Sequence, residues 1–111
     1  MAHPSENRGN HRTYDLRPTE IELKGHRFQV HDIGAEGIGL ILEKGGPQLF
    51  IGERIERIPL PLEAGVLIMP GVVSHITVTE THTVVGIRLM PDASQLQDLH
   101  RFQEERALTP A

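Results

Sequence analysis

Two arginines near the start of the chain have the right chemistry for a charged ligand. Arg8 and Arg12 lie four positions apart in a polar stretch without apolar neighbours against which they could pack. A guanidinium group offers a planar fork that matches phosphate oxygens, and its face can stack on an aromatic ring, whereas a lysine would supply only the charge. The ordinary alternative is a pair of solvated surface arginines. By itself, the pair therefore indicates a basic arm and no particular ligand.

A second motif lies in the stretch "HDIGAEGIGL". Asp32 is followed by Gly34 and Gly37, which gives the pattern Asp-x-Gly-x-x-Gly. Such a pattern is most often a tight turn, because glycine adopts positive φ and aspartate initiates turns. The glycines would also let a planar ligand lie directly against the backbone. Taken alone, the motif leaves both interpretations open.

The segments around these motifs predict short strands separated by turns. They are rich in valine, isoleucine and threonine and are bounded by glycine and proline. Pro59 and Pro61 exclude their segment from the centre of a sheet, since proline cannot donate a ladder hydrogen bond. The candidate strand segments, from which six or seven strands are expected, cover residues 19–23, 27–33, 37–42, 48–52, 53–60, 65–69, 72–80 and 83–90.

One helix is expected at the end of the chain, over about residues 93–106. Asp92 and Gln95 form a capping-box pattern at its start. Apolar residues then recur at helical spacing, with charged residues on the other faces. The apolar stripe consists of Leu96, Leu99 and Phe102.

Consecutive short strands followed by one helix predict an all-β domain. We expect a six- to seven-stranded antiparallel β-barrel with one C-terminal α-helix. Residues 1–18 lack apolar periodicity and are expected to form a flexible arm that carries both arginines, with the barrel and helix in residues 19–111.

The amino-acid composition and the missing motifs exclude several classes of function. The chain has 111 residues and no cysteine, which excludes disulfides, zinc–thiolate sites and thiol nucleophiles. Its formal charge of −4 argues against sequence-independent nucleic-acid binding. No nucleophile elbow or phosphate-binding loop occurs, and no apolar run reaches the length of a membrane span. A cytoplasmic protein without catalytic residues or a resident cofactor is expected.

Together, the two motifs resemble the paired signature of PilZ domains, which bind the bacterial second messenger cyclic di-GMP. In that family an Arg-x-x-x-Arg segment precedes the barrel, and an Asp/Asn-x-Ser-x-x-Gly segment lies between early strands. The sequences "GVLIMPGVVSHITVTE" and "VVGIRLM" look like the family's middle and closing strands, so the resemblance covers about residues 8–106.

This resemblance implies a ligand site made of Arg8, Arg12, Asp32, Gly34 and Gly37. The arginines would bind phosphate and base, Asp32 would accept hydrogen bonds from a guanine, and the glycines would permit close approach. The protein would be a bacterial receptor that signals to a protein partner, which the sequence does not identify. It also does not fix the oligomeric state.

The chain departs from the family pattern at Gly34, where serine is usual. One lost hydrogen bond to a charged group typically costs about 1.5–3 kcal/mol, which weakens binding roughly ten- to hundredfold. A PilZ-like interaction module that binds no cyclic di-GMP is therefore an open alternative.

A metal-dependent enzyme is the second alternative. The stretch "GVLIMPGVVSH" partly resembles a motif of cupins, barrels that hold a metal through histidines and a glutamate. His31, Glu36 and His75 would be the ligands, but Ile33 occupies the place of another histidine. A metal site needs three or four converging ligands, so scattered histidines without a metal are the preferred interpretation.

Overall fold

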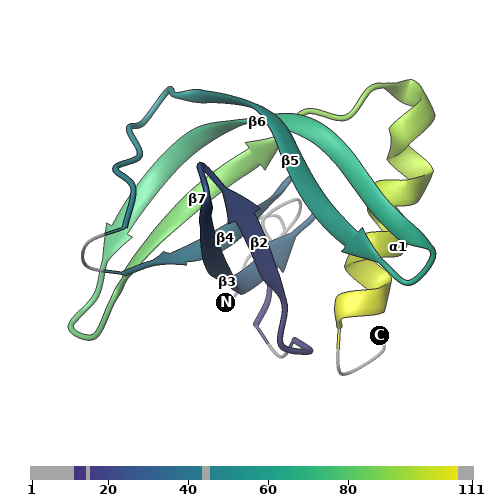
Figure 1. Cartoon of the computed structure of the whole chain (residues 1–111). Helices are drawn as coiled ribbons and strands as arrows, with labels where there is room; N and C mark the ends of the chain where they lie inside the picture. Colours follow the sequence, from purple (N-terminus) through teal and green to yellow (C-terminus); the bar gives the residue numbers. More distant parts are fainter. Residues whose placement is uncertain (1–11, 15, 44–45, 108–111) are drawn as a thin grey trace, which may run out of the picture.

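The computed structural model describes residues 12–14, 16–43 and 46–107. Seven antiparallel strands are followed by a single turn of 3-10 helix and by one α-helix (Figure 1). The elements are β1 (Arg12–Thr13), β2 (Glu20–Leu23), β3 (His26–Gly34), β4 (Gly37–Leu42), β5 (Arg54–Leu62), β6 (Gly65–Val78), β7 (Thr83–Leu89), η2 (Ala93–Gln95) and α1 (Leu96–Arg106).

The strands form a nearly closed barrel. Hydrogen-bonded neighbours follow the order β1-β3-β4-β7-β6-β5, and β2 also pairs with β3. The first part of β3 therefore pairs with β2, and its last two residues pair with β1. β5 pairs with β6, and it faces β2 without a backbone ladder between them. Pro59 and Pro61 thus lie in a strand at the end of the ladder, as their missing N–H groups require.

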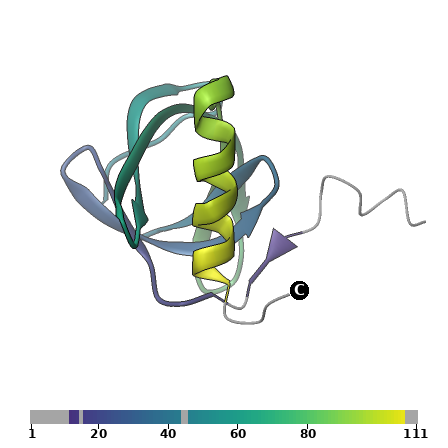
Figure 2. The same cartoon turned by 90° about the vertical axis from the view of Figure 1, so that its right-hand side faces the viewer.

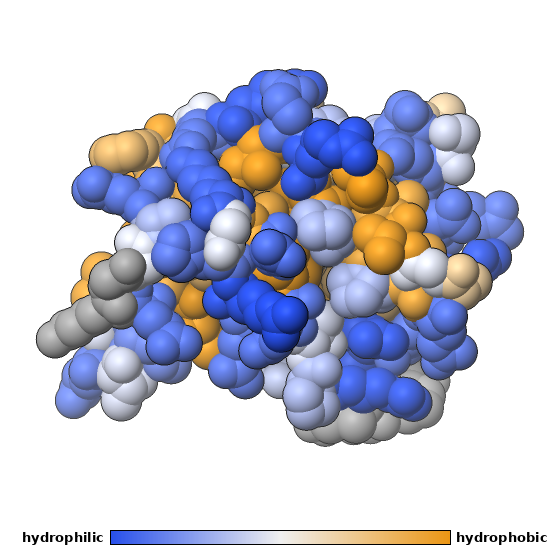
Figure 3. Space-filling model, in the orientation of Figure 1, coloured by the Kyte–Doolittle hydropathy of each residue, from blue (hydrophilic) through white to orange (hydrophobic). Residues whose placement is uncertain are grey.

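An aliphatic core fills the barrel. Ile38, Leu40, Ile58, Leu60 and Val85 are fully buried, and they come from the inward positions of three strands, β4, β5 and β7. Figure 3 shows many hydrophilic residues on one face of the molecule, with hydrophobic ones between them. Val66 and Ile68 of β6 are among the exposed hydrophobic side chains. The alternation of inward and outward residues is what a strand period of two produces.

The helix crosses one end of the barrel (Figure 2). Leu99 and Phe102 are buried beneath it and belong to the same core cluster as the strands. Asp92 caps the preceding turn by accepting from the Gln95 amide at 3.1 Å, while the Gln95 side chain accepts from the Asp92 amide. The capping-box prediction is confirmed, but Leu96, expected in the apolar stripe, is 57% exposed.

Three predicted strand segments differ from the observed strands. Residues 48–52 form no strand; they lie in a connection in which Leu49 alone is buried. The segments expected at 65–69 and 72–80 are one long strand, β6, which continues through Pro70 and Gly71. The register of β6 against β7 shifts between Val73 and His75, so Ser74 occupies a bulge.

Candidate functional site

β1 brings the backbone of Arg12 to the Asp-x-Gly-x-x-Gly motif. The strand pairs antiparallel with the end of β3, so that Arg12 lies opposite Gly34 and Thr13 lies opposite Ile33. Twenty-two positions separate Arg12 from Gly34 in the sequence, and the β-ladder closes that separation. Arg8, the other predicted arginine, lies outside the described residues.

Asp32 lies on the outer side of β3 but is only 5% exposed. Its Oδ2 atom is 2.7 Å from Nδ1 of His31, within hydrogen-bonding distance. A Cβ atom added to the facing residue, Gly39, would meet both oxygens and the carbon of this carboxylate, the farthest at 3.1 Å. The absence of a side chain at Gly39 is therefore what makes room for Asp32.

One glycine of the predicted motif, Gly37, has a structural reason of its own. Positive φ in the described glycines occurs at Gly25, Gly52 and Gly65, so the expected positive φ is not found at Gly34 or Gly37. At Gly37, an added Cβ would collide with the backbone carbonyl of Ile87 on β7. Close strand approach, and not turn geometry, accounts for this glycine.

The carbonyl of Gly34 is tied to the helix. Gly34 is buried, and its oxygen accepts a hydrogen bond of 2.8 Å from the Gln103 side-chain amide. The same amide nitrogen lies 3.3 Å from the carbonyl oxygen of Ala35. The turn between β3 and β4 is thus anchored to α1. Gly34 is also the residue that pairs with Arg12 of β1 through the backbone.

A row of four residues crosses the outer face beside this turn. Asp32 pairs with Gly39, Gly39 with Gly86, and Gly86 with His75. The Asp32 carboxylate lies over Gly39, and the imidazole of His75 lies over Gly86. We call Gly39 and Gly86 the glycine floor. The two side chains lean over this floor from opposite sides.

Aromatic rings border the same region. Tyr14 meets His31 edge to face, with ring centroids 5.5 Å apart, and the His82 ring lies 5.3 Å from that of His31. A groove of about 160 Å³ opens here. Its lining residues are Tyr14, His31, Asp32, His75, Thr77, Thr79 and Val84.

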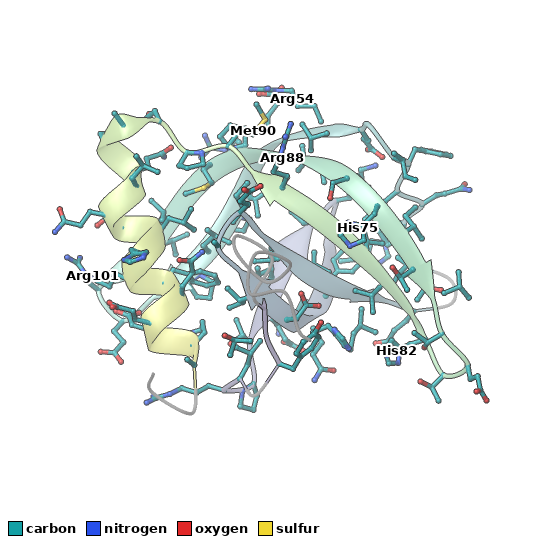
Figure 4. The ribbon with its side chains drawn as sticks, turned by 180° about the vertical axis from the view of Figure 1, so that it is seen from behind. Arg54, His75, His82, Arg88, Met90 and Arg101 are labelled. Carbon is teal, nitrogen blue, oxygen red and sulfur yellow. The ribbon has the colours of Figure 1, made fainter. Side chains whose placement is uncertain are left out.

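One exposed arginine on the same face is not among the predicted site residues. Arg88 of β7 pairs with Gly37, and no ion pair of the described residues includes it. Figure 4 shows Arg88 toward Met90 and Arg54, whereas His75 lies farther along the strand toward His82. The sequence signal that could have revealed this face was the pair of interior glycines, Gly39 and Gly86, because glycine inside a strand marks a close approach.

The residues of the metal-site alternative do not form a metal centre. In the part of the chain that the structure describes, no group of three or more histidine, aspartate or glutamate residues could hold a metal ion. Glu36 is exposed in the β3–β4 turn, whereas His75 lies on β6. None of the described helices is long and apolar enough to cross a membrane.

Comparisons with known proteins identify the fold. No protein-family model matches the chain, and no curated protein matches it. Solved structures do match. The PilZ domain of YcgR from Escherichia coli with c-di-GMP has a TM-score of 0.61 at 20% identity, covering 81% of this chain and 83% of that domain.

Two longer proteins contain a similar domain. YcgR from Escherichia coli in complex with c-di-GMP gives a TM-score of 0.63 at 21% identity over 81% of this chain. The Bacillus subtilis inhibitor of motility MotI/DgrA gives 0.58 at 22% identity over 83% of this chain. This chain spans 41% of the length of that YcgR chain and 46% of MotI. The protein therefore has a PilZ-like fold, as the sequence predicted.

Proposed function

We propose that this protein is a non-catalytic receptor for cyclic di-GMP, with Arg8, Arg12, Asp32, Gly34 and Gly37 as its ligand site. The observation that carries the proposal is the pairing of the Arg12 backbone with Gly34, because it joins the two motifs on one edge of a PilZ-like barrel. Two similar structures contain c-di-GMP according to their descriptions.

Each proposed contact has a chemical reason. The guanidinium groups of Arg8 and Arg12 bind a phosphate or the O6 and N7 edge of a guanine. Asp32 accepts from the donor edge of a guanine while His31 holds one of its oxygens. Gly34 contributes backbone polar groups in place of the serine hydroxyl that the family pattern has there, and Gly37 keeps the surface beside it free of a side chain.

The proposed output is a change in the surface seen by a protein partner. Residues 1–18 would be the arm that closes on the ligand, and residues 19–111 the barrel and helix that receive it. Fixing an arm consumes part of the binding free energy, so the affinity is lower than the contacts alone would give. The proposed setting is the bacterial cytoplasm, and the site needs no cofactor. MotI, an inhibitor of motility, is a structural neighbour that agrees with a regulatory role.

A second candidate is a PilZ-like interaction module that binds no cyclic di-GMP. Two observations favour it. The Asp32 carboxylate is nearly buried and already bonded to His31, and the backbone collision at Gly37 explains that glycine without any ligand.

Calorimetric titration with cyclic di-GMP distinguishes the two candidates. We expect micromolar or tighter binding to the intact chain, and at least tenfold weaker binding after Arg12→Ala, because charge-assisted hydrogen bonds are lost. Arg101→Ala is the matched control, since Arg101 is an exposed arginine of α1 whose ion pair with Asp98 is 3.4 Å long. It should bind like the unaltered protein.

A higher salt concentration and the substitution Asp32→Asn test the proposed contacts in the same titration. Raising the salt concentration should weaken binding, since exposed charge contacts are screened. Asp32→Asn should weaken it as well, because the amide keeps the shape of the carboxylate but not its charge. Absence of heat and of thermal stabilisation at high ligand concentration would favour the interaction module instead.

A further inference from the structure

The imidazole of His75 lies face down on the glycine floor. A Cβ atom added to Gly86 would meet Cε1, Nε2 and Nδ1 of the His75 ring, the farthest at 2.6 Å. The three distances are 2.1, 2.4 and 2.6 Å, whereas a point in the ring plane beyond Cε1 would lie much farther from both nitrogens than from Cε1. The ring therefore turns a face, and not its edge, to the position above Gly86 on β7. Any side chain at position 86 would displace it.

Ser74 fixes the orientation of this ring. The Ser74 hydroxyl donates to the carbonyl of Gly86 at 3.1 Å, and its oxygen lies 3.1 Å from Nδ1 of His75. A hydroxyl has one proton, so with that proton on the Gly86 carbonyl the His75 Nδ1–H must be the donor to Ser74. The bulge at Ser74 is what places both side chains on the same side of the sheet.

The second face of the ring is open. His75 is exposed although one face of its ring is covered by Gly86, so the exposed area belongs to the other face and to the ring edge. This face borders the groove that also contains Asp32 and Tyr14. Figure 4 shows His75 on the back of the barrel, against β7. The chain thus presents a flat, oriented aromatic surface next to a carboxylate.

We infer that the open face of His75 is a stacking platform for one purine base of the ligand. The inference rests on the proposed function, and it adds a residue that lies outside the two motifs. A nucleobase stacks on aromatic side chains through its π-face, and an imidazole that is already oriented loses little entropy when the base arrives. Because Gly86 has no side chain, the ring lies close to β7, and a base stacked on its open face would remain near the barrel and the Asp32 carboxylate.

The test is a calorimetric titration of the intact chain with cyclic di-GMP, using three substitutions of His75. Removing the ring in His75→Ala should weaken binding roughly tenfold or more, the effect typical of a lost base stack. His75→Phe keeps an aromatic face without ring nitrogens and should bind within a few fold of the unaltered protein. His75→Asn keeps a polar group without an aromatic face and should behave like His75→Ala. His100→Ala, which removes an exposed histidine of α1, is the matched control and should have no effect.

Two further measurements distinguish the loss of base stacking from a loss of folding. Thermal denaturation followed by circular dichroism should show the same melting temperature for the His75 variants within a few degrees, since the residue is exposed. In the unaltered protein, the Cε1 proton resonance of His75 should shift upfield on addition of cyclic di-GMP, because a stacked base shields it. Gly86→Ala should weaken binding too, since it displaces the ring without removing it.

Each outcome decides a different claim. Binding by the unaltered protein that survives His75→Ala overturns the platform and leaves the proposed function in place. Binding that His75→Phe abolishes as fully as His75→Ala assigns the effect to a ring nitrogen and also overturns the platform. No binding by the unaltered protein overturns the proposed function, and the platform with it.

Discussion

The two sides of β4 and β7 face opposite environments and have opposite construction. Inside the barrel, Ile38, Leu40, Val85 and Ile87 are buried in an aliphatic core. On the outside, the same strands carry Gly37, Gly39 and Gly86; the Asp32 carboxylate lies over Gly39 and the His75 imidazole over Gly86. The inner side fills space with methyl groups, and the outer side leaves space for a carboxylate, an imidazole and, in the proposed complex, a ligand.

Within β4 and within β7, the inward residues stabilise the fold, whereas the outward positions belong to the proposed ligand surface. Burying apolar side chains supplies most of the free energy of folding, so the inner strand residues and the buried residues of α1 stabilise the barrel. Glycines contribute no side-chain burial and weaken a strand, so a row of them on the outer face needs a separate reason. At Gly37 that reason is a backbone contact, and at the glycine floor it is room for Asp32 and His75.

A substitution in the buried core should have the largest effect on the free energy of unfolding. Phe102 is fully buried under α1, and Phe102→Ala should lower the free energy of unfolding by about 3–5 kcal/mol, because it removes apolar contacts and leaves a cavity. Chemical denaturation followed by circular dichroism measures this change. Leu96→Ala is the control, since Leu96 is exposed on the same helix and should change stability little. Equal effects of the two substitutions would show that the helix does not close the core.

On the outer side, the stability cost of replacing a glycine by alanine should depend on the atoms that the added Cβ would contact. Gly37→Ala should cost about 1–3 kcal/mol of stability, because its Cβ collides with the Ile87 carbonyl and the ladder must shift. Gly86→Ala should cost less than about 1 kcal/mol, because exposed His75 can turn away and alanine reduces the entropy of the unfolded chain. Thermal and chemical denaturation of both variants measure the difference.

A double substitution tests the explanation for Gly86. If its only obstacle is the imidazole, Gly86→Ala should be better tolerated in a His75→Ala background than in the unaltered chain. The same background should not improve Gly37→Ala, whose obstacle is backbone. Two strictly additive pairs would mean that His75 does not rest on Gly86 in solution.

Much of the fold could be predicted because its determinants are local. Asp92 and Gln95 are three residues apart, and their capping box formed as expected. Residues 48–52 misled the prediction because Phe50 and Ile51 are residue types that favour strands, but both are exposed in a connection in which only Leu49 is buried. The single long β6 was missed because Pro70 and Gly71 usually interrupt strands. Here Gly71 is required where Ile58, Ile87 and the Arg88 carbonyl lie too close for a Cβ.

The candidate site could be predicted only in part, since its second half depends on register. The resemblance to the paired PilZ signature predicts a common site for Arg12 and Asp32, and the ladder brings the Arg12 backbone to Gly34. The meeting of Asp32 and His75 over two glycines required the register of four strands and a bulge at Ser74. A one-residue shift in any of those ladders would send the side chains to the other face, and sequence alone does not specify that shift.

The smallest predicted effect lies away from both sides, at an exposed ion pair. Glu53 accepts from Lys24 and from the Phe50 amide, the latter at 3.0 Å, and the hydrogen bond from Lys24 is the main reason why the pKa of Glu53 lies below its ordinary value of 4.5. A carboxylate with a lowered folded-state pKa stabilises the fold above the unfolded pKa, and this contribution disappears as the pH falls through the folded value. Glu53→Gln should therefore cost roughly a few tenths of a kcal/mol at pH 7. As the pH falls below 4.5 and through the lower folded-state value, the unaltered protein and the variant should converge in melting temperature. Convergence should also occur at pH 7 in high salt, because the pair is exposed to screening; a gap that persists in salt would assign the effect to the Phe50 hydrogen bond instead of the ion pair.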